Sequence, residues 1–119
     1  MVIDIEDRDG ICILRPKGNL VVSTDWEYLR SKSDEIRSRN YKKVLADLTE
    51  VHYMDSTVIS FLVGIYTSVT ARSNGRFILA GANQRVRHIL DLTRLATVIT
   101  MTDDFESGLA AIMAEEPPA

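Results

Sequence analysis

The sequence holds one cysteine, Cys12, among its 119 residues, which excludes an internal disulfide. Cys12 stands in an apolar run typical of a strand, where a buried and inert thiol is the ordinary case. No apolar run reaches the roughly twenty residues that a membrane-spanning helix needs. The first residues are acidic and alternating, unlike a signal peptide. We therefore expect a cytoplasmic protein with no membrane insertion.

Basic charge is also scarce, with 14 lysines and arginines against 17 acidic residues and a net charge of -3. This balance speaks against nucleic acid or an anionic membrane as a partner. His52 and His88 lie far apart, with no cysteine or carboxylate cluster at metal-ligand spacing, so no metal is expected. No glycine-rich phosphate loop and no serine at a nucleophile elbow occur. The sequence predicts neither an enzyme nor a bound cofactor.

A set of arginines lies scattered over three predicted elements of the second half of the chain. A solvated helix face is the favoured interpretation of this set, and an acidic protein partner is the alternative. The set comprises Arg72, Arg76, Arg85, Arg87 and Arg94.

What the sequence has is the composition of an ordinary globular protein, 45% hydrophobic and 26% charged. We expect one domain over residues 1–114 and a disordered tail over 115–119. Strands alternate with helices, which requires crossover connections and therefore an α/β fold. Its sheet is mostly parallel, with an antiparallel first strand at or near the edge and four helices. The predicted strands are 2–6, 11–15, 43–48, 76–81 and 98–101, and the predicted helices are 26–38, 56–72, 83–92 and 105–113.

Boundaries and buried positions follow from the same patterns. Residues 16–19 are predicted to end the second strand, and residues 51–55 are predicted to form a loop. A cluster at residues 23–25 is predicted to cap the first helix. The positions expected to be buried are Trp26, Leu29 and Ile36 in the first helix and Val86, Ile89, Leu90 and Leu92 in the third.

The central feature is Asp55-Ser56-Thr57, which stands where a buried strand gives way to the longest apolar helix. Aspartate, serine and threonine suit a helix start because their side-chain oxygens accept from free backbone N–H groups. Negative charge is also tolerated there, since the helix dipole is positive at that end. The local chemistry favours a simple cap, and an accessible phosphate-accepting hydroxyl is the alternative.

The whole chain, from about Val2 to Met113, resembles the STAS domains, specifically the free-standing bacterial anti-sigma factor antagonists. The hallmark loop of that family stands here as residues 53–59, Tyr-Met-Asp-Ser-Thr-Val-Ile. Further matches are residues 18–20, 86–95 and 105–111. The sequence departs from the family pattern at Val58, where the family has glycine, and at Val21, where it has an acidic residue. Both departures are expected on the partner-facing surface.

The resemblance implies a partner-switching protein. In that family the serine after the aspartate, here Ser56, is phosphorylated by an anti-sigma factor that is also a serine kinase; Thr57 is the less favoured acceptor. The unphosphorylated form binds the kinase, and a PP2C-type phosphatase resets the phosphorylated form. Asp55 and Asn19 join the expected partner-binding surface. The alternative is a STAS scaffold or accessory subunit, in a stressosome-like assembly or a membrane transport complex, without a phospho-switch.

Small residues recur on one face of the central helix at steps of three and four. They are Ser56, Ser60, Gly64, Thr67 and Ala71. A bulky stripe of Val58, Leu62, Ile65 and Val69 lies on another face and is the predicted core. The small stripe fits two uses, either close packing inside the domain or a shallow groove that admits a partner helix. We favour the groove because Ser56 stands on the same stripe, and we place Ser60 and Gly64 in the partner-binding surface.

Overall fold

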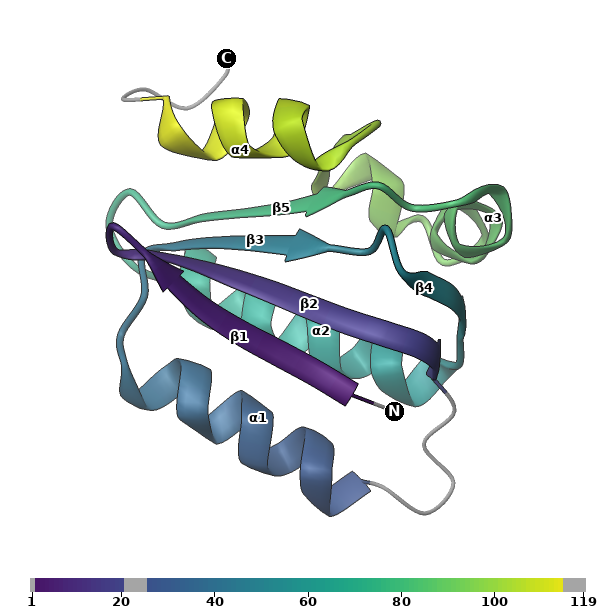
Figure 1. Cartoon of the computed structure of the whole chain (residues 1–119), viewed down its shortest axis with the longest axis horizontal. Coiled ribbons are helices and arrows are strands. Elements are labelled where there is room, and N and C mark those ends of the chain that lie inside the picture. Colours follow the sequence, from purple (N-terminus) through teal and green to yellow (C-terminus); the bar gives the residue numbers. More distant parts are fainter. Residues whose placement is uncertain (1, 21–25, 115–119) are drawn as a thin grey trace.

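A computed structural model describes residues 2–20 and 26–114 as a six-stranded sheet with helices on both faces (Figure 1). The predicted cap cluster at residues 23–25 and the predicted tail at 115–119 lie outside these ranges. The strands are β1 (Val2–Arg8), β2 (Ile11–Leu20), β3 (Lys43–Asp47), β4 (Val51–Met54), β5 (Arg76–Ala80) and β6 (Thr100–Thr102). The helices are α1 (Trp26–Ser38), α2 (Ser56–Thr70), α3 (Gln84–Leu92) and α4 (Phe105–Met113), with a short 3₁₀ turn, η1 (Leu95–Thr97).

The sheet is mixed, with the order β1-β2-β3-β5-β6, and β4 pairs with the second half of β2. β1 runs antiparallel to β2 at one edge, and the other pairs are parallel. Helices α1 and α2 cover one face, α4 covers the other, and α3 lies beside the end of the sheet where β4 is found (Figure 1). The predicted α/β architecture, with an antiparallel first strand and four helices, is confirmed.

The second strand does not end at Pro16, as the sequence pattern predicted. β2 pairs with β3 over residues 11–14 and with β4 over residues 18–20, so Pro16 falls between its two parallel neighbours. On the other side Pro16 is in register with Ile3, whose N–H donates to Tyr28 Oη at 2.9 Å rather than to β2. Because such a pair exchanges no ladder hydrogen bonds, the missing N–H of proline costs nothing here.

Residues 51–54 form strand β4, so the predicted loop at 51–55 is wrong. Val51 and Met54 are buried, whereas His52 and Tyr53 between them are exposed. This in-out-out-in pattern lacks the period of two by which a strand is recognised in a sequence. The strand instead depends on pairing with β2, whose register shifts between Gly18 and Asn19.

Two predicted core positions are exposed, and both lie at helix ends. Trp26, the first residue of α1, is 56% exposed, and the guanidinium of Arg30 lies 5.2 Å from its ring centroid. Leu92, the last residue of α3, is 71% exposed. Helical spacing marks a face of a helix, but it does not show how far along that face the packing extends. The last strand also begins later than predicted, at Thr100, after the turn η1.

The remaining core follows the predicted pattern. The bulky stripe of α2, Val58, Leu62, Ile65 and Val69, is buried against the sheet. Cys12 is fully buried in β2, and burial raises the pKa of its thiol to about 12. The predicted burial of this cysteine is confirmed, and a thiol that stays protonated at neutral pH is a poor nucleophile.

The five arginines noted in the sequence do not share a helix face. Arg72 and Arg76 lie where β5 begins, while Arg85, Arg87 and Arg94 lie on and after α3. Arg76 is buried, and its Nη1 donates to the carbonyl oxygens of Ala111 and Ala114. A solvated helix face is therefore wrong for Arg76, whose charge stabilises the carboxyl end of α4.

Within residues 2–20 and 26–114, no helix combines the length and apolar character needed to cross a bilayer. In the same ranges no three histidine, cysteine, aspartate or glutamate side chains gather closely enough to hold a metal ion.

Candidate functional site

The start of α2 is fixed by Asp55, which stands directly after the buried end of β4. Its backbone is extended, with φ −93° and ψ 178°, as expected for an N-cap residue. Its Oδ1 accepts from the backbone N–H groups of Thr57 at 3.0 Å and Val58 at 3.1 Å. Asp55 is therefore the residue of the Asp-Ser-Thr triplet that caps the helix.

Ser56 is the first residue of α2 and is exposed, as is Thr57. The structure describes every residue of the first turn of this helix, and none of them is acidic. Because Asp55 caps the helix, the hydroxyl of Ser56 is not needed to hold the helix start. The helix dipole, positive at this end, favours negative charge at this position. The geometry suits an acceptor of phosphate.

Asn19 is brought close to this helix start by the sheet. It pairs with Tyr53 across β2 and β4, and both side chains are exposed. Tyr53 precedes Asp55 by two residues, so Asn19, Tyr53 and Ser56 lie at one end of the domain. The exposed tyrosine ring adds apolar contact area to an otherwise polar surface.

A further residue, Asn83, ties α3 to the same end and was not recognised in the sequence. Its Oδ1 caps α3 by accepting from Val86 N at 2.9 Å. Its Nδ2 donates to the carbonyl oxygens of Val51 at 3.0 Å and His52 at 3.3 Å. An asparagine at the start of an amphipathic stretch is a signal that could have identified the cap, but the bridge to β4 depends on a strand that the pattern did not reveal.

A groove of about 380 Å³ separates α1 from the first half of α2. Ser60 of the small stripe lines it, together with Thr57 and Phe61 of the same helix. The side chains that α1 contributes are Trp26, Leu29, Arg30, Ser33, Asp34 and Arg37. Sequence reasoning missed this half of the groove, because nothing in the helical pattern of α1 shows which helix lies beside it.

The small stripe has different surroundings at different heights along α2. Near the helix start it borders the open groove, where Ser60 is exposed. One turn later, a Cβ added at Gly64 would lie 3.4 Å from Arg37 Nη2. Gly64 therefore faces the end of the Arg37 side chain of α1, and beyond it Thr67 is exposed again. Of the predicted partner-binding residues, Asp55 and Gly64 are half-buried and the others are exposed.

The two departures from the family pattern have different outcomes. Val58 is buried in the core, so the expectation that it touches the partner-facing surface is wrong. It belongs to the bulky stripe of α2, so its side chain fills space in the core and does not lie on the surface. Val21 lies outside the described residues.

The capping role of Asp55 is tested by replacing its side chain. Asp55→Ala removes the acceptor for two backbone N–H groups, and we expect it to lower the free energy of unfolding by about 1 kcal/mol. Asp55→Asn keeps an acceptor oxygen, and we expect it to lower the free energy of unfolding by at most a few tenths of that amount. Urea denaturation followed by circular dichroism measures both. Equal losses would show that the carboxylate charge, and not its capping hydrogen bonds, holds the helix start.

Comparison with known proteins places this geometry in context. A family profile described as STAS domain matches residues 2–108. A candidate anti-sigma factor antagonist of Thermotoga maritima is 26% identical over 104 residues, covering 87% of this chain and 91% of that protein. The crystal structure of an anti-sigma factor antagonist from Mycobacterium paratuberculosis superposes with a TM-score of 0.83 at 17% identity, over 95% of this chain and 94% of that one.

A third similar structure is that of the Bacillus cell fate determinant SpoIIAA in its phosphorylated form. It superposes with a TM-score of 0.69 at 17% identity, over 92% of this chain and 97% of that chain. At this level of identity the two solved structures establish a shared fold.

Proposed function

The chain belongs to the STAS domain family, in its anti-sigma factor antagonist branch, and we propose that it acts by partner switching. In its unphosphorylated form it binds an anti-sigma factor that is also a serine kinase, and this releases a sigma factor. Phosphorylation at Ser56 ends the binding, and a PP2C-type phosphatase restores it. The chain acts in the cytoplasm as a binding protein, without catalysis or a cofactor of its own.

The observation that carries the proposal is the division of roles at the start of α2. Asp55 caps the helix through two hydrogen bonds, so the exposed hydroxyl of Ser56 is available for modification. A phosphate there gains from the helix dipole, so the folded state accommodates it. A structure of SpoIIAA in a phosphorylated form, with the same fold, supports the same chemistry here.

The proposed docking surface surrounds this serine. It joins Asn19 and Tyr53 on the strand side to Thr57 and Ser60 on the helix side. Ser60 leads into the groove between α1 and α2, which is wide enough to take apolar side chains of a partner helix. A phosphate on Ser56 stands between the two halves of this surface and therefore disrupts both.

Phosphate mapping tests the assignment of the acceptor. After incubation with ATP and an anti-sigma factor serine kinase of the same organism, we expect one phosphate on the tryptic peptide spanning residues 44–72, located at Ser56 by fragmentation. Ser56→Ala is expected to abolish the modification, and Thr57→Ala to leave it. Phosphate on Thr57 would move the acceptor by one residue. No phosphate in the presence of a kinase active on other substrates would favour the scaffold function instead.

A further inference from the structure

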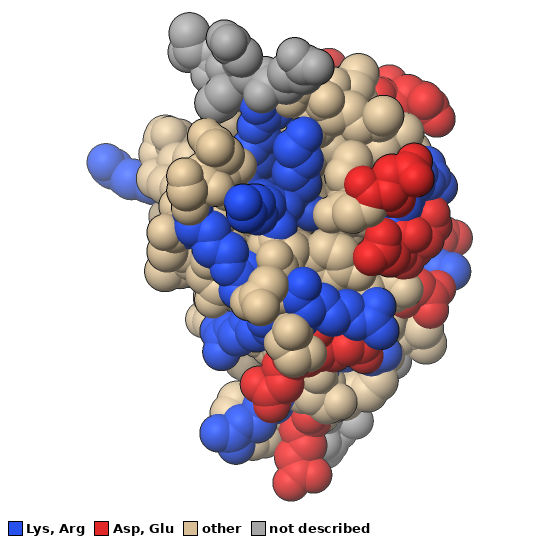
Figure 2. All heavy atoms as spheres, turned by 90° about the vertical axis from the view of Figure 1, so that its left-hand side faces the viewer, with Lys and Arg blue, Asp and Glu red and all other residues tan. Residues whose placement is uncertain are grey.

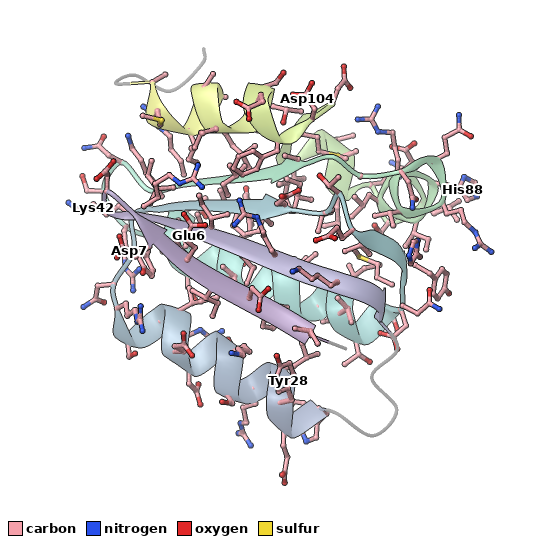
Figure 3. All side chains as sticks on the ribbon, in the orientation of Figure 1. Glu6, Asp7, Tyr28, Lys42, His88 and Asp104 are labelled. Atoms are coloured by element: carbon pink, nitrogen blue, oxygen red, sulfur yellow. The ribbon has the colours of Figure 1, made fainter. Side chains whose placement is uncertain are left out.

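The end of the domain farthest from the phosphorylation site is strongly basic. Figure 2 shows basic side chains crossing the end of the molecule at the left of Figure 1, where β3 and β5 begin. We call the side chains of this end the basic belt: Arg39, Lys42, Lys43, Arg72 and Arg76. Lys42 lies at this end and His88 of α3 at the opposite end, which is also where β4 leads into α2 (Figure 3).

The basic belt is assembled from the segment that leads into β3 and the segment that leads into β5. Backbone pairing and hydrogen bonds hold these two segments together. Lys43 and Arg76 are register partners in the parallel pair β3–β5, and Arg76 N donates to Lys42 O at 2.7 Å. Arg72 Nη1 donates to Tyr41 O at 2.7 Å. Residues far apart in the sequence therefore place their charges side by side, which explains why a net charge of -3 did not reveal them.

Part of this charge has a structural use. Arg72 and Arg76 donate to carbonyl oxygens, and Arg76 does so at the carboxyl end of α4. Arg39 is exposed, and its Nη2 lies 3.9 Å from the carboxylate of Glu35. Within residues 2–20 and 26–114, Lys42 and Lys43 make no ion pair. The structure of the domain therefore does not require all of these cations.

Two long stretches of the sequence that supply the basic belt hold no acidic residue. None occurs between Glu35 and Asp47, or between Asp55 and Asp91. Carboxylates of the described residues at this end include Glu35, which faces Arg39, and Asp7, whose Oδ2 accepts from Tyr41 Oη at 3.0 Å. Asp9 stands in the turn between β1 and β2. An excess of positive charge at one end of an acidic protein gives it a strong charge asymmetry, which steers an anionic partner to that end.

We propose that the basic belt is a second binding surface, which takes an acidic segment of a protein partner. A short acidic segment contacts the belt alone, whereas a long nucleic acid would also meet the repulsion of a chain with net charge -3. The belt and Ser56 lie at opposite ends, so one acidic segment and one kinase bind at the same time. The belt therefore binds its acidic partner whether or not Ser56 is phosphorylated.

A fluorescein-labelled peptide of eight glutamates, followed by fluorescence anisotropy at low salt, tests the proposal. Arg39→Gln/Lys42→Gln is expected to weaken its binding about tenfold, since each exposed charge contributes a modest share. The control Arg85→Gln/Arg94→Gln removes the same net charge from exposed positions near α3 and is expected to change binding less than twofold. Binding is expected to fall as salt rises. Ser56→Asp is expected to leave it unchanged.

Other results would overturn the proposal. Equal weakening by the two double variants would show an effect of net charge rather than of the belt. No binding of the peptide by the unmodified protein would remove the surface altogether. Tighter binding of an eight-nucleotide oligothymidylate, or of phosphatidylserine vesicles, would assign the belt to a different class of partner. Melting temperatures of both double variants, expected to match within a few degrees, show that the fold is retained.

Discussion

Replacing Ser56 by aspartate is expected to weaken binding of the partner kinase about a thousandfold, while Ser56→Ala binds as tightly as the unmodified protein. The new carboxylate stands beside Asp55, inside the proposed docking surface. Binding the kinase removes water from that charge, at a cost of several kcal/mol for a buried ion without a basic partner. A loss of about 4 kcal/mol corresponds to about a thousandfold in affinity.

Isothermal titration calorimetry of the purified kinase with each variant measures this effect. The matched control is Thr57→Asp, which places the same charge one residue later on the helix and is expected to have the smaller effect. The fold is expected to be retained in Ser56→Asp, because the helix dipole stabilises the charge by about 0.3–1 kcal/mol. Equal affinities of Ser56→Asp and Ser56→Ala would rule out an electrostatic switch at this residue.

Filling the groove between α1 and α2 is the second change with a large expected effect. Ser60→Leu places a bulky side chain where Ser60 and Phe61 border the groove. If a partner helix inserts there, binding is expected to fall about a hundredfold, the size of a typical hot-spot loss of 2–3 kcal/mol. Stability is expected to change by less than about 0.5 kcal/mol, because Ser60 is exposed.

The control lies on the same stripe of α2 but outside the groove. Thr67→Leu adds a similar apolar surface at an exposed position and is expected to leave kinase binding unchanged. Gly64→Leu is less selective, since its side chain would displace Arg37 and disturb the packing of α1 as well. A large fall in melting temperature for Ser60→Leu, or equal loss of binding with Thr67→Leu, would show that the groove is not the docking element.

The sequence predicted the fold well where burial follows a regular period. The bulky stripe of α2 has helical spacing and is buried as expected. Strand β4 was missed because its four residues are buried, exposed, exposed and buried, and because its pairing with β2 depends on a distant segment. Pro16 was taken as the end of β2 for a similar reason, since only the sheet shows that its missing N–H falls between two neighbours.

The site was predicted in part. Asp55 and Ser56 were identified from a motif of adjacent residues, and the structure divides their roles between capping and exposure. The α1 wall of the groove was not identified, because it lies on a separate element. Of the basic belt only Arg72 and Arg76 were noted, in a set for which an acidic protein partner was the alternative interpretation. Trp26 illustrates the difficulty, since an apolar residue at a helical position indicates the core unless the neighbouring helix is known.

Reversible binding is the most direct test of the central claim that a phosphate on Ser56 controls docking. The protein is phosphorylated stoichiometrically, titrated into the kinase by calorimetry, and titrated again after treatment with a PP2C-type phosphatase. The account predicts that phosphorylation weakens binding by a factor of about a thousand and that dephosphorylation restores the original affinity. Equal affinity of the phosphorylated and dephosphorylated protein would contradict it.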